Sequence, residues 1–286
     1  MISQFIEGLQ NYGFLRNALF TSMMVGFIAG VIGVFIVLRG MSLMGDAISH
    51  AVLPGVAVSY IIGTNYLIGA TTFGILAALL IGFVSDKSKL KNDAAIGIVF
   101  STFFAMGVIF ISFAKSSTDL YHILFGNVLA VTDSDMVITS IVGVIVILFI
   151  GIFYKDLKVS SFDPTFAQAY GVKTKFLHYA LMFALTLVAV SSLQTVGTIL
   201  VIAMLITPAA TAFLLTNKLS VMIFISAALG VISAVVGLFF SYSYNLASGA
   251  TIVLTAAVFF VIAFLFSPVK GILMNGKGGN LNEKNY

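Results

Sequence analysis

The sequence contains no cysteine and no tryptophan, and only 8% of its 286 residues are charged. Without cysteine the chain has no disulfide framework, no thiolate metal site and no catalytic thiol. Soluble globular proteins carry charge on roughly a quarter of their residues. The 14 basic and 10 acidic side chains are therefore too few to coat a water-soluble surface of this size. These shortages exclude a soluble enzyme, a nucleic-acid-binding domain and a disordered chain.

Apolar residues are what the sequence has in excess: 60% of the chain is hydrophobic and the mean hydropathy is +1.14. A helix needs roughly 20 apolar residues to cross the hydrocarbon of a bilayer. Nine runs reach that length, at about 14–38, 41–63, 65–85, 94–114, 135–154, 177–193, 195–215, 221–241 and 249–268. Lipid cannot hydrogen-bond the backbone, so the sequence predicts an all-α polytopic transmembrane bundle. Only Gln194 and Gly197 separate two of the runs, so eight spans is the alternative.

Short connections place residues 14–268 in a single transmembrane domain, flanked by residues 1–13 and a polar tail at 269–286. Cytoplasmic loops carry an excess of Lys and Arg. With nine spans and the C-terminus inside, only Arg16 and Lys115 fall outside. The inner side then holds Arg39, Lys87, Lys89, Lys91, Lys155, Lys158, Lys173, Lys175, Lys218, Lys270, Lys277 and Lys284. This asymmetry predicts an extracellular N-terminus and a cytoplasmic tail, and it explains the basic pI without any nucleic-acid partner.

One pair of ionisable residues lies deep within a predicted span. Asp46 and His50 are four residues apart, so on a helix their side chains share one face. If that helix begins near Met41, His50 lies roughly 13–14 Å into a hydrocarbon core of about 30 Å. Ionisable residues at that depth are candidates for a functional site.

Pro54 follows this pair in the same span and has no N–H to offer the carbonyl of His50, so a kink is predicted there. A carboxylate, an imidazole and a freed carbonyl would then lie close together, and such ligands suit a divalent first-row cation. The competing interpretation is an Asp–His hydrogen bond that only locks two helices together.

Other ionisable residues have simpler interpretations. Asp119 and His122 fall in an outer loop, where a solvated capping pair is the preferred interpretation. Asp133 and Asp135 flank the start of the fifth span as capping residues. His178 begins the sixth span and is interpreted as an interfacial histidine.

The stretch 195–212 is rich in small and hydroxyl residues, which allow helix backbones to approach closely in lipid. Pro208 leaves the carbonyl of Met204 without its helical donor, and Thr207 or Thr211 is expected to cover it. A packing seam and the wall of a pore both fit this composition.

The inner loop between Lys155 and Lys175 contains helix-capping signals. Asp163 is a potential N-cap, Pro164 suits the first helical position and Gly171 suits the end, with Ala167 inside the helix. A short capped helix on the cytoplasmic face predicts a docking element for a soluble partner.

Two catalytic signatures are missing from the sequence. No G-x-x-x-x-G-K-[ST] phosphate-binding loop is present, so any ATPase that drives transport is a separate chain. The H-E-x-x-H motif of metalloproteases is also missing, which argues against a membrane-embedded protease.

Residues 41–55, Met-Ser-Leu-Met-Gly-Asp-Ala-Ile-Ser-His-Ala-Val-Leu-Pro-Gly, resemble the signature of the ABC-3 family of metal-ion permeases. These are membrane subunits of bacterial manganese, zinc and iron importers. The stretches 119–127, 162–171 and 196–212 also resemble the family, and the similarity extends over about residues 14–268. Over its whole length, the sequence is most similar to manganese permeases of Gram-positive bacteria.

The resemblance implies a transport subunit with no enzymatic activity, located in the plasma membrane of a Gram-positive bacterium. Members of the family work as homodimers with a cytoplasmic ATP-binding subunit and an extracellular metal-binding lipoprotein. It implies that Asp46 and His50 bind the metal in the translocation path. It also implies that the helix formed by Asp163, Pro164, Ala167 and Gly171 couples to the ATPase.

The resemblance implies a transported divalent cation and no permanently bound cofactor, with manganese favoured over zinc or iron. The lack of thiolate ligands agrees with manganese, but a site of oxygen and nitrogen ligands also binds zinc. The alternative class is a stand-alone ion-coupled secondary transporter. Such a carrier usually needs more intramembrane ionisable groups than one pair, and it needs no docking helix.

The basic-residue distribution predicts how cysteines introduced into this cysteine-free chain will react in intact cells. A cysteine at Ser88 is expected to be shielded from an impermeant thiol reagent added outside, whereas one at Ser117 is expected to be labelled. The reverse labelling pattern would show that the predicted orientation is wrong. Equal labelling of cysteines introduced at Ile2 and Asn280 would put both ends of the chain on the same side of the membrane, which indicates eight spans.

Overall fold

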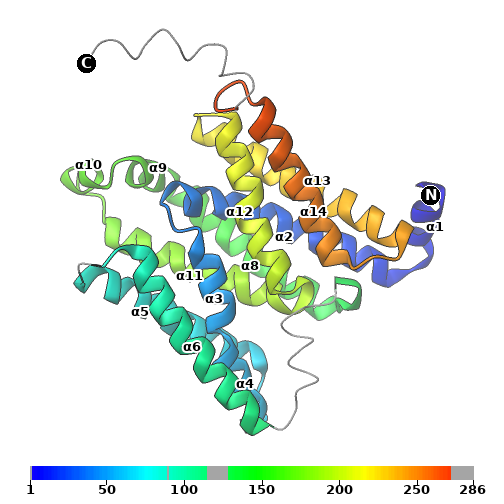
Figure 1. Ribbon diagram of the computed structural model, residues 1–286, viewed down its shortest axis with the longest axis horizontal. Helices are drawn as coiled ribbons and strands as arrows, with labels where there is room; N and C mark the ends of the chain where they lie inside the picture. The colour runs from blue at the N-terminus through cyan, green and yellow to red at the C-terminus, as the bar shows by residue number, and fades with distance from the viewer. Residues whose placement is uncertain (1, 89, 115–127, 272–286) are drawn as a thin grey trace.

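The computed structural model describes residues 2–88, 90–114 and 128–271, and helices joined by short turns make up these ranges (Figure 1). Nine helical segments in them are long and apolar enough to cross a membrane, so the prediction of an all-α bundle with nine spans is confirmed. The spans are α2 (Gly13–Leu38), α3 (Leu43–Ala51) with α4 (Leu53–Ile62), α5 (Tyr66–Lys87), α6 (Asn92–Ala114), α8 (Asp133–Ile152), α11 (Thr174–Val196), α12 (Thr198–Leu215), α13 (Leu219–Tyr244) and α14 (Ser248–Phe266).

Four shorter helices complete the described chain: α1 (Ile2–Asn11), the 3-10 turn η1 (Val128–Ala130), α9 (Tyr154–Phe162) and α10 (Pro164–Ala169). The sequence reading anticipated α10 but neither α1 nor α9. Helix α1 is held against the end of α13, where the ring of Phe5 meets Phe239 and Tyr242 at centroid distances of 5.5 and 5.8 Å. The predicted N-terminal segment 1–13 is therefore largely a helix packed on the bundle.

Two breaks in the helices have clear local causes. The second span is interrupted at Val52, and Pro54 is the second residue of α4, so the predicted proline kink is present. Gly197 alone separates α11 from α12, and its φ of +80° lies in a region that side chains with a Cβ rarely adopt. The weak boundary near residues 194–197 is therefore a real break between two spans.

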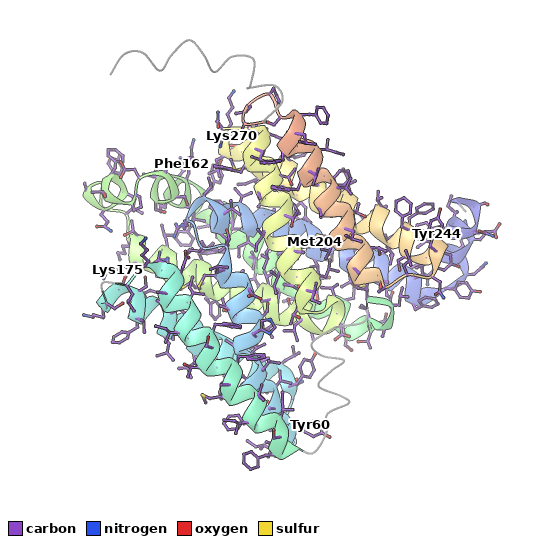
Figure 2. The ribbon with its side chains drawn as sticks, viewed as in Figure 1. Tyr60, Phe162, Lys175, Met204, Tyr244 and Lys270 are labelled. Atoms are coloured by element: carbon purple, nitrogen blue, oxygen red, sulfur yellow. The ribbon has the colours of Figure 1, made fainter. Side chains whose placement is uncertain are left out.

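The spans form two groups that share α11. Helices α2, α12, α13 and α14 pack together, and α3, α4, α5 and α6 form the other group, with α11 lying against α3, α5, α8 and α12 (Figure 1). Figure 2 shows Phe162, Lys175 and Lys270 along the top and left of the bundle, whereas Tyr60 and Tyr244 lie at the bottom and right. Lys175 and Lys270 thus lie toward the same end of the spans, as the predicted charge asymmetry requires.

The most extensive helix contact joins α2 to α13, and small residues make it. A Cβ atom built on Gly26 would lie 2.6 Å from the carbonyl oxygen of Gly230, and one on Gly30 would lie 2.8 Å from that of Ser226. The Ser226 hydroxyl donates a 2.7 Å hydrogen bond to the carbonyl oxygen of Gly30. Close backbone approach of this kind is the main source of helix association in lipid.

We expect Gly26→Val to destabilise the protein, because the new side chain would overlap backbone atoms of α13 that no rotamer change can move. Overpacking of this kind costs about 1–3 kcal/mol. The thermal unfolding midpoint of the purified protein, followed by circular dichroism, should fall by several degrees. Gly151→Val is the matched control, since a Cβ at Gly151 meets nothing within 4 Å. Equal midpoints for the two variants would contradict the close packing of α2 on α13.

Candidate functional site

Helix α3 has one buried face and one open face. Met44, Ala47 and Ile48 are buried against the neighbouring helices, and the side chain of Leu205 on α12 lies against Gly45. Asp46 and His50 lie on the opposite side, where their side chains are 44% and 26% exposed in the single chain. The helix therefore carries its two ionisable side chains on the face that the chain itself leaves open.

Asp46 and His50 are brought together by one turn of α3. The Asp46 Oδ1 atom lies 3.4 Å from the His50 Nε2 atom, at the i, i+4 spacing predicted from the sequence. Both atoms belong to the same helix, so this contact links successive turns and does not join two helices. A carboxylate oxygen and an imidazole nitrogen at this separation can act as two ligands of one cation.

The imidazole of His50 is held from the side by two aromatic residues of α6. The rings of Phe100 and Phe104 each approach it edge-on, with centroid distances of 5.6 Å. The buried Nδ1 atom of His50 has no hydrogen-bond partner among the described residues. The ring is thus packed on its Nδ1 side and directs Nε2 towards Asp46. The sequence reading missed Phe100 and Phe104, since nothing in it showed which helix lies beside α3.

A metal ion would need more ligands than this pair supplies. Among the residues that the structure describes, no group of three or more His, Cys, Asp or Glu side chains lies close enough to hold a metal ion. Asp119 and His122, the other acid–histidine pair of the sequence, lie outside the described residues. The chain by itself therefore offers two side-chain ligands, on an open face.

The α12 segment is buried inside the bundle. Met204 and Thr211 are each 1% exposed, and Pro208 is buried as well. The Thr211 hydroxyl donates to the carbonyl oxygen of Thr207 at 2.7 Å. Of the two threonines expected to cover the Met204 carbonyl, Thr211 is therefore not the donor, and Thr207 stays a prediction. This burial favours the packing interpretation of the segment over the pore-wall interpretation.

Helix α10 is formed as its capping signals predict. The Asp163 carboxylate accepts a 2.8 Å hydrogen bond from the Phe166 N–H, and Pro164 is the first residue of the helix. Ala167 is fully buried, and Gly171 ends the segment with φ at +89°. At the other end of the bundle, Thr132 and Asp135 form a capping box at the start of α8.

Aromatic side chains lie on the outer surface of α10. Phe166 and Tyr170 are 58% and 80% exposed, and their rings stack at a centroid distance of 6.1 Å. An exposed aromatic pair on a short, rigid helix is a surface suited to contact with another protein.

Comparison with known proteins finds relatives that are similar to this chain over almost its whole length. The chain is 67% identical over 273 residues to the manganese transport system membrane protein MntC of Listeria innocua, covering 96% of this chain and 98% of the relative. It is 58% identical over 268 residues to the manganese import system permease protein ScaB of Streptococcus gordonii, covering 94% and 96%.

A solved structure has the same fold. The chain superimposes on PsaBC from Streptococcus pneumoniae in complex with Fab with a TM-score of 0.86 and 57% identity, covering 94% of this chain and 98% of that chain. The model of the ABC 3 transport family matches residues 11–267, a range that includes all nine spans. The chain therefore belongs to the ABC 3 transport family.

Proposed function

We propose that the chain is the membrane permease subunit of an ATP-driven importer of manganese. The observation that carries the proposal is the Asp46–His50 pair on the open face of α3, with its ligand atoms 3.4 Å apart. Relatives that are 67% and 58% identical are named as manganese transport and import proteins. Manganese, zinc and iron all accept oxygen and nitrogen ligands, so the choice of manganese depends on these relatives.

A second copy of the chain completes the site in this proposal. A carboxylate near the bilayer centre costs about 2.5–3.5 kcal/mol on the insertion scale, and ionisable residues in spans usually face protein or water. The exposed fractions of Asp46 and His50 would leave both side chains facing lipid in a lone chain. A two-fold dimer places equivalent faces opposite each other. Two such pairs supply four ligands, and carbonyl groups or water complete the coordination.

Two other partners belong to the proposal. A cytoplasmic ATP-binding subunit supplies the energy, since the sequence has no phosphate-binding loop of its own. It docks on α10, where the Asp163 cap and the buried Ala167 fix a helix that presents Phe166 and Tyr170. An extracellular metal-binding lipoprotein delivers the cation to the opposite end of the bundle.

We expect Asp46→Asn to abolish manganese uptake while expression and folding remain near wild type, because the substitution keeps the shape and removes the charged ligand. His50→Ala is expected to have the same effect. Changes outside the first coordination shell of metal sites already cost about 10–100-fold, so a loss of at least tenfold is expected here. Uptake of radioactive manganese by cells and the metal content of the purified protein measure the effect.

Asp93→Asn is the control for charge removal, since Asp93 is an exposed residue in the first turn of α6. It is expected to transport normally. If Asp46→Asn left both uptake and bound manganese unchanged, the pair would be reduced to a contact between two turns of α3.

We expect the double substitution of Phe166→Ala and Tyr170→Ala to weaken binding of the ATP-binding subunit without unfolding the permease, because both side chains are largely exposed. Co-purification of the two subunits and ATP hydrolysis by the reconstituted complex measure the effect. Phe224→Ala is the control, since Phe224 is 75% exposed and belongs to α13, a different helix. Normal co-purification and normal transport in the double variant would refute docking at α10.

A further inference from the structure

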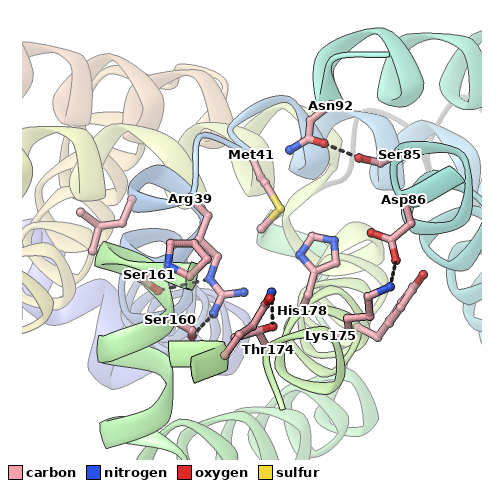
Figure 3. Close-up of a pocket in the computed structure, with 14 residues that line it drawn as sticks. Arg39, Met41, Ser85, Asp86, Asn92, Ser160, Ser161, Thr174, Lys175 and His178 are labelled. Carbon is pink, nitrogen blue, oxygen red and sulfur yellow. Dashed lines mark hydrogen bonds and ion pairs between the residues drawn. The ribbon is translucent and has the colours of Figure 1, made fainter. Parts of the chain in front are cut away.

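A polar cavity of about 390 Å³ lies where several spans end on the side of α9 and α10 (Figure 3). The end of α5, the start of α6, the start of α11 and the turn after α2 line it, together with α9 and α10. This cavity is separate from the Asp46–His50 pair, neither of which lines it. A water molecule occupies about 30 Å³, so the cavity is large enough for a small anion and several water molecules.

Arg39 is the half-buried cation of the cavity, and only neutral groups accept its hydrogen bonds. Its Nε atom donates to the Ser161 hydroxyl at 3.2 Å and its Nη2 atom donates to the Ser160 hydroxyl at 2.8 Å (Figure 3). In the described part of the chain, no carboxylate lies within ion-pair distance of the guanidinium. Burial lowers the pKa of Arg39, and no nearby acid offsets this.

The acid that lines the cavity is already paired. The Asp86 carboxylate lies 3.1 Å from the Lys175 ammonium, so this pair of charges cancels across α5 and α11. The guanidinium of Arg39 therefore remains as a surplus positive charge inside the cavity. Buried charges in proteins are normally paired, since an uncompensated charge is costly to remove from water.

Further hydrogen-bonding groups surround this charge. The Thr174 hydroxyl accepts a 3.0 Å hydrogen bond from the Gln168 amide, which leaves its own proton available. The Ser161 hydroxyl accepts from Arg39 and also keeps its proton. His178 lines the same cavity, and Figure 3 shows its ring between Met41 and Lys175. Hydroxyl and imidazole donors around a guanidinium are the chemistry that recognises phosphate oxygens.

We propose that this cavity binds a phosphate group, with Arg39 as the main charge partner and Ser161, Thr174 and His178 as hydrogen-bond donors. Free phosphate and a phospholipid headgroup offer the same oxygens. The ends of α5, α6 and α11 put the cavity at the level of the lipid headgroups, where basic pockets between spans bind anionic lipids.

Thermal unfolding of the purified protein tests free phosphate. Inorganic phosphate, compared with chloride at the same ionic strength, is expected to raise the wild-type unfolding midpoint by about 2–4 °C near saturation. Arg39→Gln is expected to lose this shift. Lys158→Gln, which removes an exposed positive charge on α9 outside the cavity, is expected to retain it.

Native mass spectrometry after mild delipidation tests the headgroup. Phosphatidylglycerol retained by the wild type and by Lys158→Gln, but lost from Arg39→Gln, would identify the lipid as the source. A phosphate shift with no retained lipid would identify the free anion. Either result supports the site, and neither depends on transport or on the identity of the cargo.

Ser161→Asp provides a second test if Arg39→Gln fails to fold. An aspartate at this position would place a carboxylate beside the Arg39 Nε atom and replace the anion. This variant is expected to be at least as stable as the wild type without phosphate, and to respond to neither phosphate nor phosphatidylglycerol. The proposal is overturned if Ser161→Asp responds like the wild type, or if Lys158→Gln loses as much binding as Arg39→Gln.

Discussion

The close contact between α2 and α13 is the constraint on which the rest of the bundle depends. Lipid is as apolar as the side chains, so burial of leucine or phenylalanine gives no large driving force for helix association. Gly26 and Gly30 instead bring α2 within backbone contact of Gly230 and Ser226. Gly33, one turn further along, lies directly against the backbone of Leu205 on α12. Helix α2 is thereby fixed between two neighbours, and it in turn fixes where the following turn and α3 begin.

Helix α3 connects this packing to the chemistry of the site. Small residues such as Gly45 and Ala47 let one side of the helix lie deep in the bundle, so the opposite side carries Asp46 and His50 at a defined depth. The turn before α3 is also tied to α9 by the hydrogen bonds from Arg39 to Ser160 and Ser161. Through these hydrogen bonds, the short segment from Arg39 to His50 connects helix α9 and the polar cavity to the Asp46–His50 pair.

Local patterns in the sequence are sufficient to predict the spans, the break at Pro54 and the cap at Asp163, because each of these features depends on neighbouring residues. Helices α1 and α9 were missed because they are short and too polar to register as spans. The contacts of His50 with Phe100 and Phe104 depend on how α6 docks beside α3, which no local pattern records. In the sequence, Arg39 counts only as one of the basic residues that indicate membrane orientation. Its hydrogen-bond partners lie 121 and 122 residues away, too far for a local pattern to reveal them. Orientation and the partner subunit concern the membrane and other chains, so a single chain leaves them as predictions.

The single-residue turn at Gly197 has a consequence for how the protein is made. Helix α11 ends at Val196 and α12 begins at Thr198, and both of these residues are buried. A ribosome-bound chain therefore has no hydrophilic loop with which to anchor α11 while α12 is still being synthesised. We therefore expect the two segments to enter the membrane together as a helical hairpin. Helix α11 would then gain its packing against α12 at the moment both spans reach the bilayer.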